Sequence, residues 1–123
     1  MKTFGSHIRK IRQDKKLGLR EVATFLGIAP SYLSDIEKDR RNPPRNPEVI
    51  RKLAQILGEK SDYLMNLAGN QQVNKIPPDM AEVFSEYGNG AGALLRTIKR
   101  KGLSKDQVRK LIEKIDEIED NEP

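Results

Sequence analysis

The chain lacks cysteine altogether and has a single histidine among its 123 residues. Without cysteine, the protein can form neither disulfide bonds nor thiolate-ligated metal sites. His7 has no carboxylates beside it at ligand spacing, so we expect no metal site. No apolar run approaches the ~20 residues that a membrane-spanning helix needs, and the N-terminus shows no signal-peptide pattern. We therefore expect a cytoplasmic protein that does not engage a membrane.

Sequence patterns of catalysis are also missing. The chain contains no nucleophile elbow, no glycine-rich phosphate loop and no triad of metal ligands. The acidic residues near the C-terminus, such as Glu113 and Asp116, alternate with Lys110 and Lys114, which is typical of a solvated helix face. The sequence thus predicts a protein that is not an enzyme, with no catalytic residues and no cofactor.

The charge that is present is unevenly distributed along the chain. The net charge is +5, and residues 1–70 contain 14 of the 23 basic residues but only 8 of the 18 acidic ones. Residues 71–123 are nearly neutral. A solvated surface alone could explain a modest positive charge, but a basic excess confined to one segment favours a nucleic-acid partner.

The segment of residues 17–44 carries the strongest local pattern. Its first apolar set, Leu19, Val22 and Leu26, recurs at helical spacing, and Gly27 then permits a positive φ at the end of that helix. Leu33 and Ile36 form the inner stripe of a second short helix. The opposite face of that second helix is small and polar, which suits insertion into the major groove of DNA.

These residues resemble the Cro/CI-type helix-turn-helix family, also called the XRE family, in its SinR-like branch. The resemblance rests on LGLREVA at 17–23, LGIA at 26–29 and LSDIE at 33–37, and it extends over about residues 4–69. It implies an all-α fold with a five-helix, lambda-repressor-like domain. The helices are expected at about 3–15, 19–26, 30–38, 47–57 and from Ser61, as N-cap, onward, with Tyr63, Leu64 and Leu67 buried.

Two sets of residues are candidates for contacts with double-stranded DNA. The base-contact candidates lie on or just before the exposed face of the second short helix: Ala29, Pro30, Ser31, Tyr32, Ser34 and Asp35. The phosphate-contact candidates are arginines: Arg20, Arg40, Arg41 and Arg45. The sequence leaves two roles open for the Asp35 carboxylate: it could accept a hydrogen bond from cytosine, or it could form a local salt bridge.

Three positions depart from the family pattern. Leu19 stands where the family often has glutamine, Ala29 where a Ser or Thr usually caps the helix, and Asp39 where a glycine usually follows the Ile-Glu pair. The resemblance also implies a structural role for Glu37, which usually pairs with a basic side chain of the same domain. Its candidate partners are Arg9, Arg12 and Arg20.

The C-terminal part of the chain has a different organisation. We expect a DNA-binding domain at 1–69, a linker at 70–78 and a helical dimerisation segment at 79–121, with Gly88–Gly92 as a turn or joint. Ser104 should cap the last helix, whose apolar stripe follows nearly a/d spacing. This stripe is the candidate dimerisation seam: Val108, Leu111, Ile112, Ile115 and Ile118.

About fifty residues are too few to enclose a large core, so this tail needs a partner surface. A second copy of the chain would supply the two-fold symmetry that palindromic operators favour. The tail could instead fold back on its own domain. The sequence therefore predicts a dimeric DNA-binding repressor. The alternative is a protein-interaction module, such as an antitoxin or anti-regulator, whose tail neutralises a partner protein.

Overall fold

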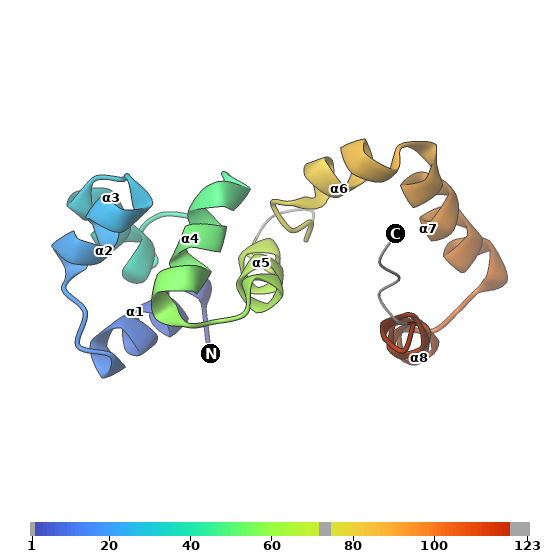
Figure 1. The fold of residues 1–123 in the computed structure, drawn as a ribbon, viewed down its shortest axis with the longest axis horizontal. Helices are drawn as coiled ribbons and strands as arrows, with labels where there is room; N and C mark the ends of the chain where they lie inside the picture. The colour runs from blue at the N-terminus through green and yellow to red at the C-terminus, as the bar shows by residue number, and fades with distance from the viewer. Residues whose placement is uncertain (1, 72–74, 119–123) are drawn as a thin grey trace. The chain divides into compact units, whose positions relative to one another are not determined.

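A computed structural model describes residues 2–71 and 75–118 of the chain (Figure 1). The described residues form α-helices joined by short loops, with no strand among them, which confirms the expected all-α class. The chain divides into two compact units, Met1–Ala81 and Glu82–Pro123. In the described parts of the chain, none of the helices combines the length and apolar character that crossing a bilayer requires.

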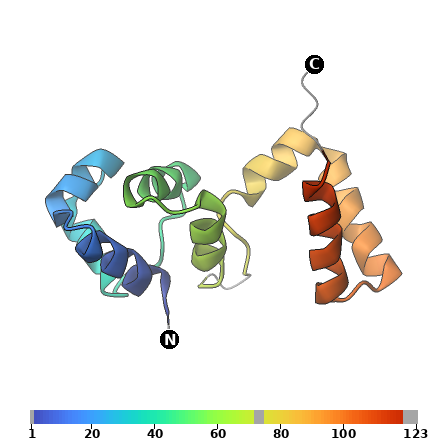
Figure 2. The same ribbon diagram turned by 60° about the horizontal axis from the view of Figure 1, so that its bottom comes forward.

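The first unit contains five helices packed around one hydrophobic core (Figure 2). They are α1 (Phe4–Asp14), α2 (Leu19–Leu26), α3 (Pro30–Glu37), α4 (Pro47–Leu57) and α5 (Ser61–Gly69). Every helix contributes buried side chains, from Phe4 in α1 to Ala68 in α5. The contacts of α3 with both α1 and α2 matter most for function, because they leave only one face of this helix outside the core.

Helices α2 and α4 occupy the predicted ranges because strong local signals end them. Gly27 and Gly58 adopt the left-handed conformation after each helix, with φ of 74° and 70°. At the start of α4, the Asn46 side chain accepts from the Glu48 N–H (3.0 Å), and Pro47 occupies the first helical position. Helix termini built from such residues can be predicted without tertiary information.

The close approach of α1 to α3 depends on a glycine that the sequence pattern did not single out. A methyl group on Gly5 would overlap the backbone carbonyl oxygen of Ile36. A glycine inside a helix normally lowers helix stability relative to alanine. Here the missing side chain lets the backbone of α1 approach the backbone at the end of α3, so Gly5 helps set the position of α3.

His7 and Glu59 form another contact that sequence reasoning missed. The imidazole of His7 pairs with the carboxylate of Glu59, and its ring packs edge-on against Tyr63 at 5.2 Å. This contact ties α1 to the α4–α5 turn. His7 is thus buried and paired with a residue that is distant from it in the sequence.

Two expectations for α5 were wrong. Ser61 is the first residue of the helix and not its cap, which is Lys60 and makes no side-chain hydrogen bond. Tyr63 is 42% exposed, because its ring covers His7 at the surface while Leu64, Met65 and Ala68 face the core. The helical stripe is therefore shifted by one position from the predicted one.

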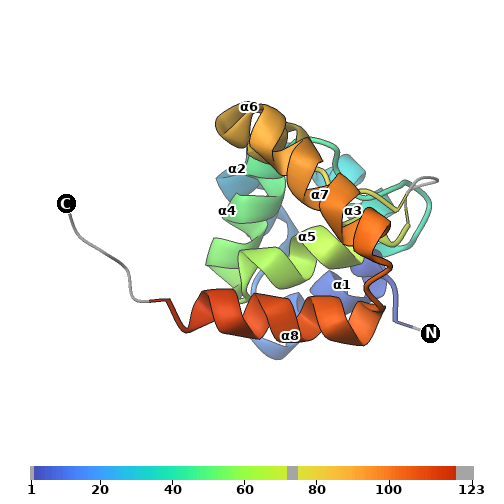
Figure 3. The same ribbon diagram turned by 90° about the vertical axis from the view of Figure 1, so that its right-hand side faces the viewer.

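The second unit is built from helices that expose their apolar residues. Helix α6 (Met80–Tyr87) leads into this unit, and α7 (Asn89–Lys101) and α8 (Lys105–Asp116) lie wholly within it (Figure 3).

The prediction of a turn over Gly88–Gly92 was wrong after Gly88, since Asn89–Gly92 form the first turn of α7. Ser104 caps α8 in a reciprocal pair of hydrogen bonds with Gln107, as predicted. None of the residues that the structure describes in α6 to α8 is buried.

Two of the expected segments, the linker 70–78 and the dimerisation segment 79–121, can be compared with the structure only in part. The described residues of the expected linker 70–78 belong to the first unit, where the Phe4 N–H donates to Gln71 Oε1 at 2.6 Å. Residues 72–74 of this linker and residues 119–121 of the expected dimerisation segment lie outside the described residues.

Candidate nucleic-acid interface

All six predicted base-contact residues lie at the N-terminus or on the outer face of α3. Leu33 and Ile36 are each 1% exposed on the opposite face and anchor the helix in the core. The six candidates are half-buried or exposed along the N-terminus and outer side of α3: Ala29, Pro30, Ser31, Tyr32, Ser34 and Asp35. Ala29 makes no side-chain cap, and Pro30 occupies the first turn, where no backbone donor is needed. The helix thus presents a small, polar surface on a rigid support.

A buried ion pair fixes the orientation of α3. Arg12 donates through Nε and Nη2 to the two carboxylate oxygens of Glu37, at 2.7 and 3.0 Å. Its Nη1 also donates to the carbonyl of Leu17 at 2.9 Å, so one guanidinium joins α1, the α1–α2 loop and α3. The side chains are only 13% and 4% exposed. Of the three candidate partners for Glu37, the structure selects Arg12.

The electrostatics of this pair follow from its hydrogen bonds. The pKa of Arg12 is raised above its ordinary value by the hydrogen bond to Glu37, with a further contribution from the carboxylate charge. Burial acts in the opposite direction, because it disfavours a charged group. The Arg12 guanidinium therefore remains charged, and its hydrogen bonds to Glu37 hold α3 to α1.

The loop between α3 and α4 carries three of the four predicted phosphate contacts. Arg40, Arg41 and Arg45 are exposed, whereas Pro43 and Pro44 are buried and hold the loop against the domain. Arg20, the fourth, is exposed in the first turn of α2. The loop arginines therefore project from an anchored backbone.

The start of this loop is held by a contact across the domain. Asp39 adopts a positive φ of 61°, the conformation that the family's usual glycine would favour. Its carboxylate accepts a hydrogen bond from the Thr3 hydroxyl at 3.0 Å. Thr3 is also the N-cap of α1, so the cap of the first helix secures the first residues of the basic loop.

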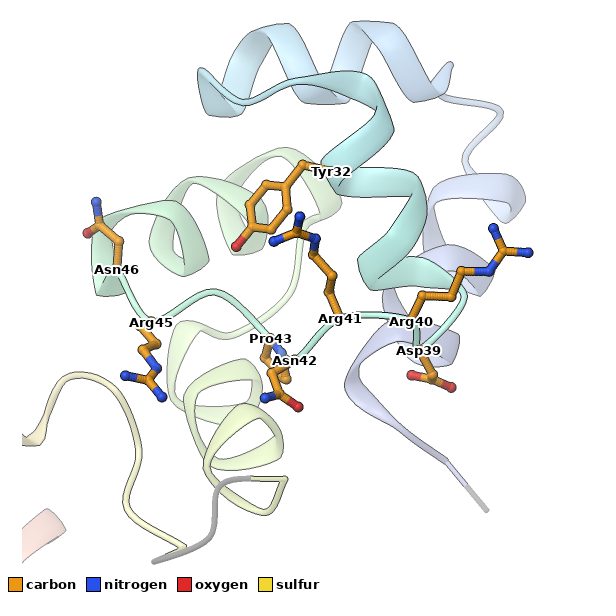
Figure 4. Close-up of a pocket in the computed structure, with 8 residues that line it drawn as sticks. All are labelled: Tyr32, Asp39, Arg40, Arg41, Asn42, Pro43, Arg45 and Asn46. Carbon is orange, nitrogen blue, oxygen red and sulfur yellow. The ribbon is translucent and has the colours of Figure 1, made fainter.

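An open hollow of about 660 Å³ lies between the loop and α3. Figure 4 shows its lining residues, which are Tyr32, Asp39, Arg40, Arg41, Asn42, Pro43, Arg45 and Asn46. Three arginines face one carboxylate in this set, so the hollow is basic. Side-chain amides and guanidinium groups are suitable donors for the oxygens of a phosphate backbone.

Tyr32, Asp35 and Arg41 form a cluster at the rim of the hollow. The Arg41 guanidinium lies 5.3 Å from the Tyr32 ring centroid, and its Nε is 4.0 Å from Asp35 Oδ2. A local salt bridge was one of the two readings of Asp35, and this ion pair supports it. Sequence reasoning assigned Tyr32 and Asp35 to base contacts and Arg41 to a phosphate contact, and it did not anticipate that the three residues meet.

Four of the five predicted dimerisation residues lie in α8, and Ile118 follows the end of this helix. The exposed fractions of Ile112, Ile115 and Ile118 are 53%, 51% and 65%, while Leu111 is 36% exposed and Val108 is half-buried. Large apolar side chains of α7, including Leu94 and Leu95, are also more than half exposed. Large apolar side chains exposed together on one helix are typical of protein–protein contacts.

Comparisons with known proteins match the domain that carries this site. The family model described as a helix-turn-helix domain matches residues 5–70. Two proteins of Bacillus subtilis (strain 168) are similar to the chain. The uncharacterized HTH-type transcriptional regulator RghRB is 33% identical over 87 residues, and the HTH-type transcriptional repressor RghR is 36% identical over 69 residues. These matches cover 71% and 56% of the chain.

The chain spans only 60% of the length of RghRB and 50% of RghR. Its similarity to the HTH-type transcriptional regulator SinR of Bacillus licheniformis extends further. That protein is 30% identical over 112 residues, which are 89% of each chain. This match includes the C-terminal helices as well as the first unit.

Proposed function

Because the chain belongs to the helix-turn-helix family, in the branch that contains SinR, we propose that it is a sequence-specific DNA-binding transcriptional regulator. The family assignment confirms the resemblance of residues 17–37. The observation that carries the functional proposal is the outer face of α3, a small polar surface beside a basic loop, held by the buried Arg12–Glu37 pair. The protein acts in the cytoplasm by binding and not by catalysis.

In this proposal α3 enters the major groove, whose width admits one helix. The hydroxyl groups of Ser31 and Ser34 donate to or accept from base edges, and Ala29 and Pro30 contact thymine methyl groups. Arg40, with Arg20 and Arg45, neutralises phosphates on either side of the groove. The arrangement supports repression by occlusion, in which the bound protein covers the site that polymerase needs.

The second unit supports a dimer in this proposal. The apolar face of α8 is unburied within the described residues, and pairing two copies would remove Ile112 and Ile115 from water. A two-fold dimer presents two α3 helices to successive major grooves, about 34 Å apart. The proposed operator is therefore a palindrome with half-sites about one helical turn apart.

In vitro selection from a library of random duplexes tests this function directly. The full chain should enrich a palindromic consensus, and the enriched duplex should compete with random duplex by at least about 10³-fold. Enrichment of no sequence, with equal binding to all duplexes, would contradict sequence-specific regulation.

We predict that binding to this operator depends strongly on salt. With about four to eight phosphates neutralised per dimer, the slope of log K against log salt should be about −4 to −7. Arg40→Ala should weaken binding to all sequences alike and flatten the slope by about one unit per protomer. Titrations at several salt concentrations measure this slope.

Lys52→Ala is a matched control for the salt prediction. It removes one exposed cation from α4, outside α3 and the basic loop, and should leave the slope unchanged. An affinity that stays constant from low to high salt would count against phosphate contacts altogether.

We also predict that Ser31 and Tyr32 set sequence preference. Ser31→Ala combined with Tyr32→Ala should lower operator binding by about 2–4 kcal/mol, at about 1–3 kcal/mol for each base contact that Ser31 makes or that Tyr32 makes or supports. Binding to random duplex should barely change, because that binding depends on charge. Equal losses on operator and random DNA would instead assign these residues to the fold or to the orientation of the domain.

The exposed apolar faces of α7 and α8 also favour a second candidate function. In this alternative the second unit binds a different protein. Either the chain neutralises the activity of that protein, or that protein neutralises the activity of the chain. The two functions can coexist, since a repressor dimer can be opened by a competing antagonist. Co-purification of a dissimilar protein that is lost with the second unit would favour this alternative.

A further inference from the structure

The cluster of Tyr32, Asp35 and Arg41 joins α3 to the basic loop between α3 and α4. Tyr32 and Asp35 are three residues apart in α3 and so lie side by side on its surface. Arg41 comes from the loop and reaches back over both, with its guanidinium 5.3 Å from the ring centroid and 4.0 Å from the carboxylate. One loop side chain is thereby placed on the face of α3 that we propose to enter the groove.

The Arg41 side chain is 61% exposed, and its contacts with Tyr32 and Asp35 orient it. Tyr32 is half-buried and packs against the hydrophobic core, so its ring is a fixed platform for the cation. The loop backbone on both sides of Arg41 is also anchored, because Pro43 and Pro44 are buried and the Thr3 hydroxyl donates a hydrogen bond to Asp39. The conformational entropy that a free arginine would lose on binding is therefore already partly lost in this protein.

The two neighbouring loop arginines lack this arrangement. Figure 4 shows Arg41 reaching toward Tyr32, while Arg40 points away from it and Arg45 lies farther along the loop. Arg40 and Arg45 thus suit the backbone contacts proposed above, whereas Arg41 lies against α3.

The geometry at Asp35 leaves the donors of Arg41 available. A separation of 4.0 Å between Nε and Oδ2 is an ion pair without a hydrogen bond, so the carboxylate orients the guanidinium by charge without occupying its donors. The same pairing offsets the repulsion that an isolated carboxylate on this face would experience from phosphates. Asp35 is therefore better explained as a partner of Arg41 than as a contact to cytosine.

We infer that Arg41 reads a guanine in the major groove, with Tyr32 and Asp35 as its positioning residues. The guanidinium fork matches the O6 and N7 acceptors that guanine presents there, and no other base offers that pair of acceptors. This inference rests on the proposed function of the domain and assigns Arg41 a base, where the sequence suggested a phosphate.

Selection from random duplexes with the full chain and its variants tests this inference. We expect the wild-type consensus to contain a guanine at one symmetric position of each half-site. Arg41→Ala should reduce the preference for that guanine about 10-fold or more and leave the other positions unchanged. Arg41→Lys should recover affinity without recovering the preference, because an ammonium lacks the planar fork.

Arg40→Ala is the matched control, since it removes the same side chain from the neighbouring position. It should lower affinity for all duplexes and leave the consensus intact. If Arg41→Ala behaved in the same way, with an unchanged consensus, Arg41 would be a phosphate contact and the inference would be overturned. If the wild-type chain selected no consensus, the proposed function would fail first and the inference with it.

Two further variants separate positioning from folding. Tyr32→Phe keeps the ring and should keep the guanine preference, whereas Tyr32→Ala should weaken it. Asp35→Asn keeps the shape, removes the charge and should weaken the preference at the same guanine, with the thermal unfolding midpoint unchanged. A change in preference at a different base would give Asp35 a contact of its own and overturn its positioning role.

Discussion

Replacing Ile112 and Ile115 together with aspartate is expected to convert the protein to a monomer and to lower operator affinity about 10²- to 10⁴-fold. Both side chains are half exposed on α8 and lie at the centre of the proposed seam. Pairing the two copies would then bury four carboxylates without partners, which is strongly unfavourable. A monomer contacts one half-site at a time and loses the second, intramolecular contact that links the half-sites.

Sedimentation equilibrium and operator titration measure the two parts of this prediction. The matched control combines Lys110→Ala with Lys114→Ala, which changes the net charge by the same amount. These lysines are 73% and 78% exposed and pair with acidic residues of the second unit, so the control should remain a dimer. If the aspartate variant stayed dimeric with full affinity, the tail would be free for another protein and the partner-binding function would gain support.

Removal of the whole second unit provides an independent test. The cut belongs after Ala81, because Gln71 accepts a hydrogen bond from Phe4 and Pro77 lies against Gly69 in the first unit. The remaining fragment contains the complete core and should fold as a monomer with weak half-site binding.

Glu37→Ala is expected to lower the free energy of unfolding by about 3–5 kcal/mol. The substitution removes a carboxylate that is 4% exposed and leaves the guanidinium of Arg12 buried without its counter-charge. Because the same pair orients α3, operator binding should fall in parallel with stability. Urea unfolding followed by far-ultraviolet circular dichroism measures the shift of the midpoint at constant slope.

Two further variants show whether this loss comes from a buried charge. Asp14→Ala breaks the exposed pair with Lys10, at 2.9 Å, and should change stability by less than about 1 kcal/mol. Arg12→Met combined with Glu37→Leu removes both charges and should be less destabilising than Glu37→Ala alone. A loss of under about 1 kcal/mol for Glu37→Ala would show that water or another side chain compensates Arg12.

The sequence by itself determined the features that depend on local signals. The ranges of α2 and α4, the capping of α8 by Ser104 and the buried stripe of α3 follow from side-chain periodicity and from residues that end or begin helices. The family pattern likewise pointed to α3 as the helix proposed to contact DNA, because its motif residues are close together in the chain. Such information is contained in windows of a few turns and requires no knowledge of distant neighbours.

Only the tertiary structure decided which distant residues meet. Arg12 was one of three candidate partners for Glu37, and the approach of α1 to α3 across Gly5 selected it. The pairing of His7 with Glu59 and the placement of Arg41 over Tyr32 have no local signature, since each joins separate elements. These contacts depend on the angles and distances between packed helices, which the core as a whole sets and short sequence patterns do not encode.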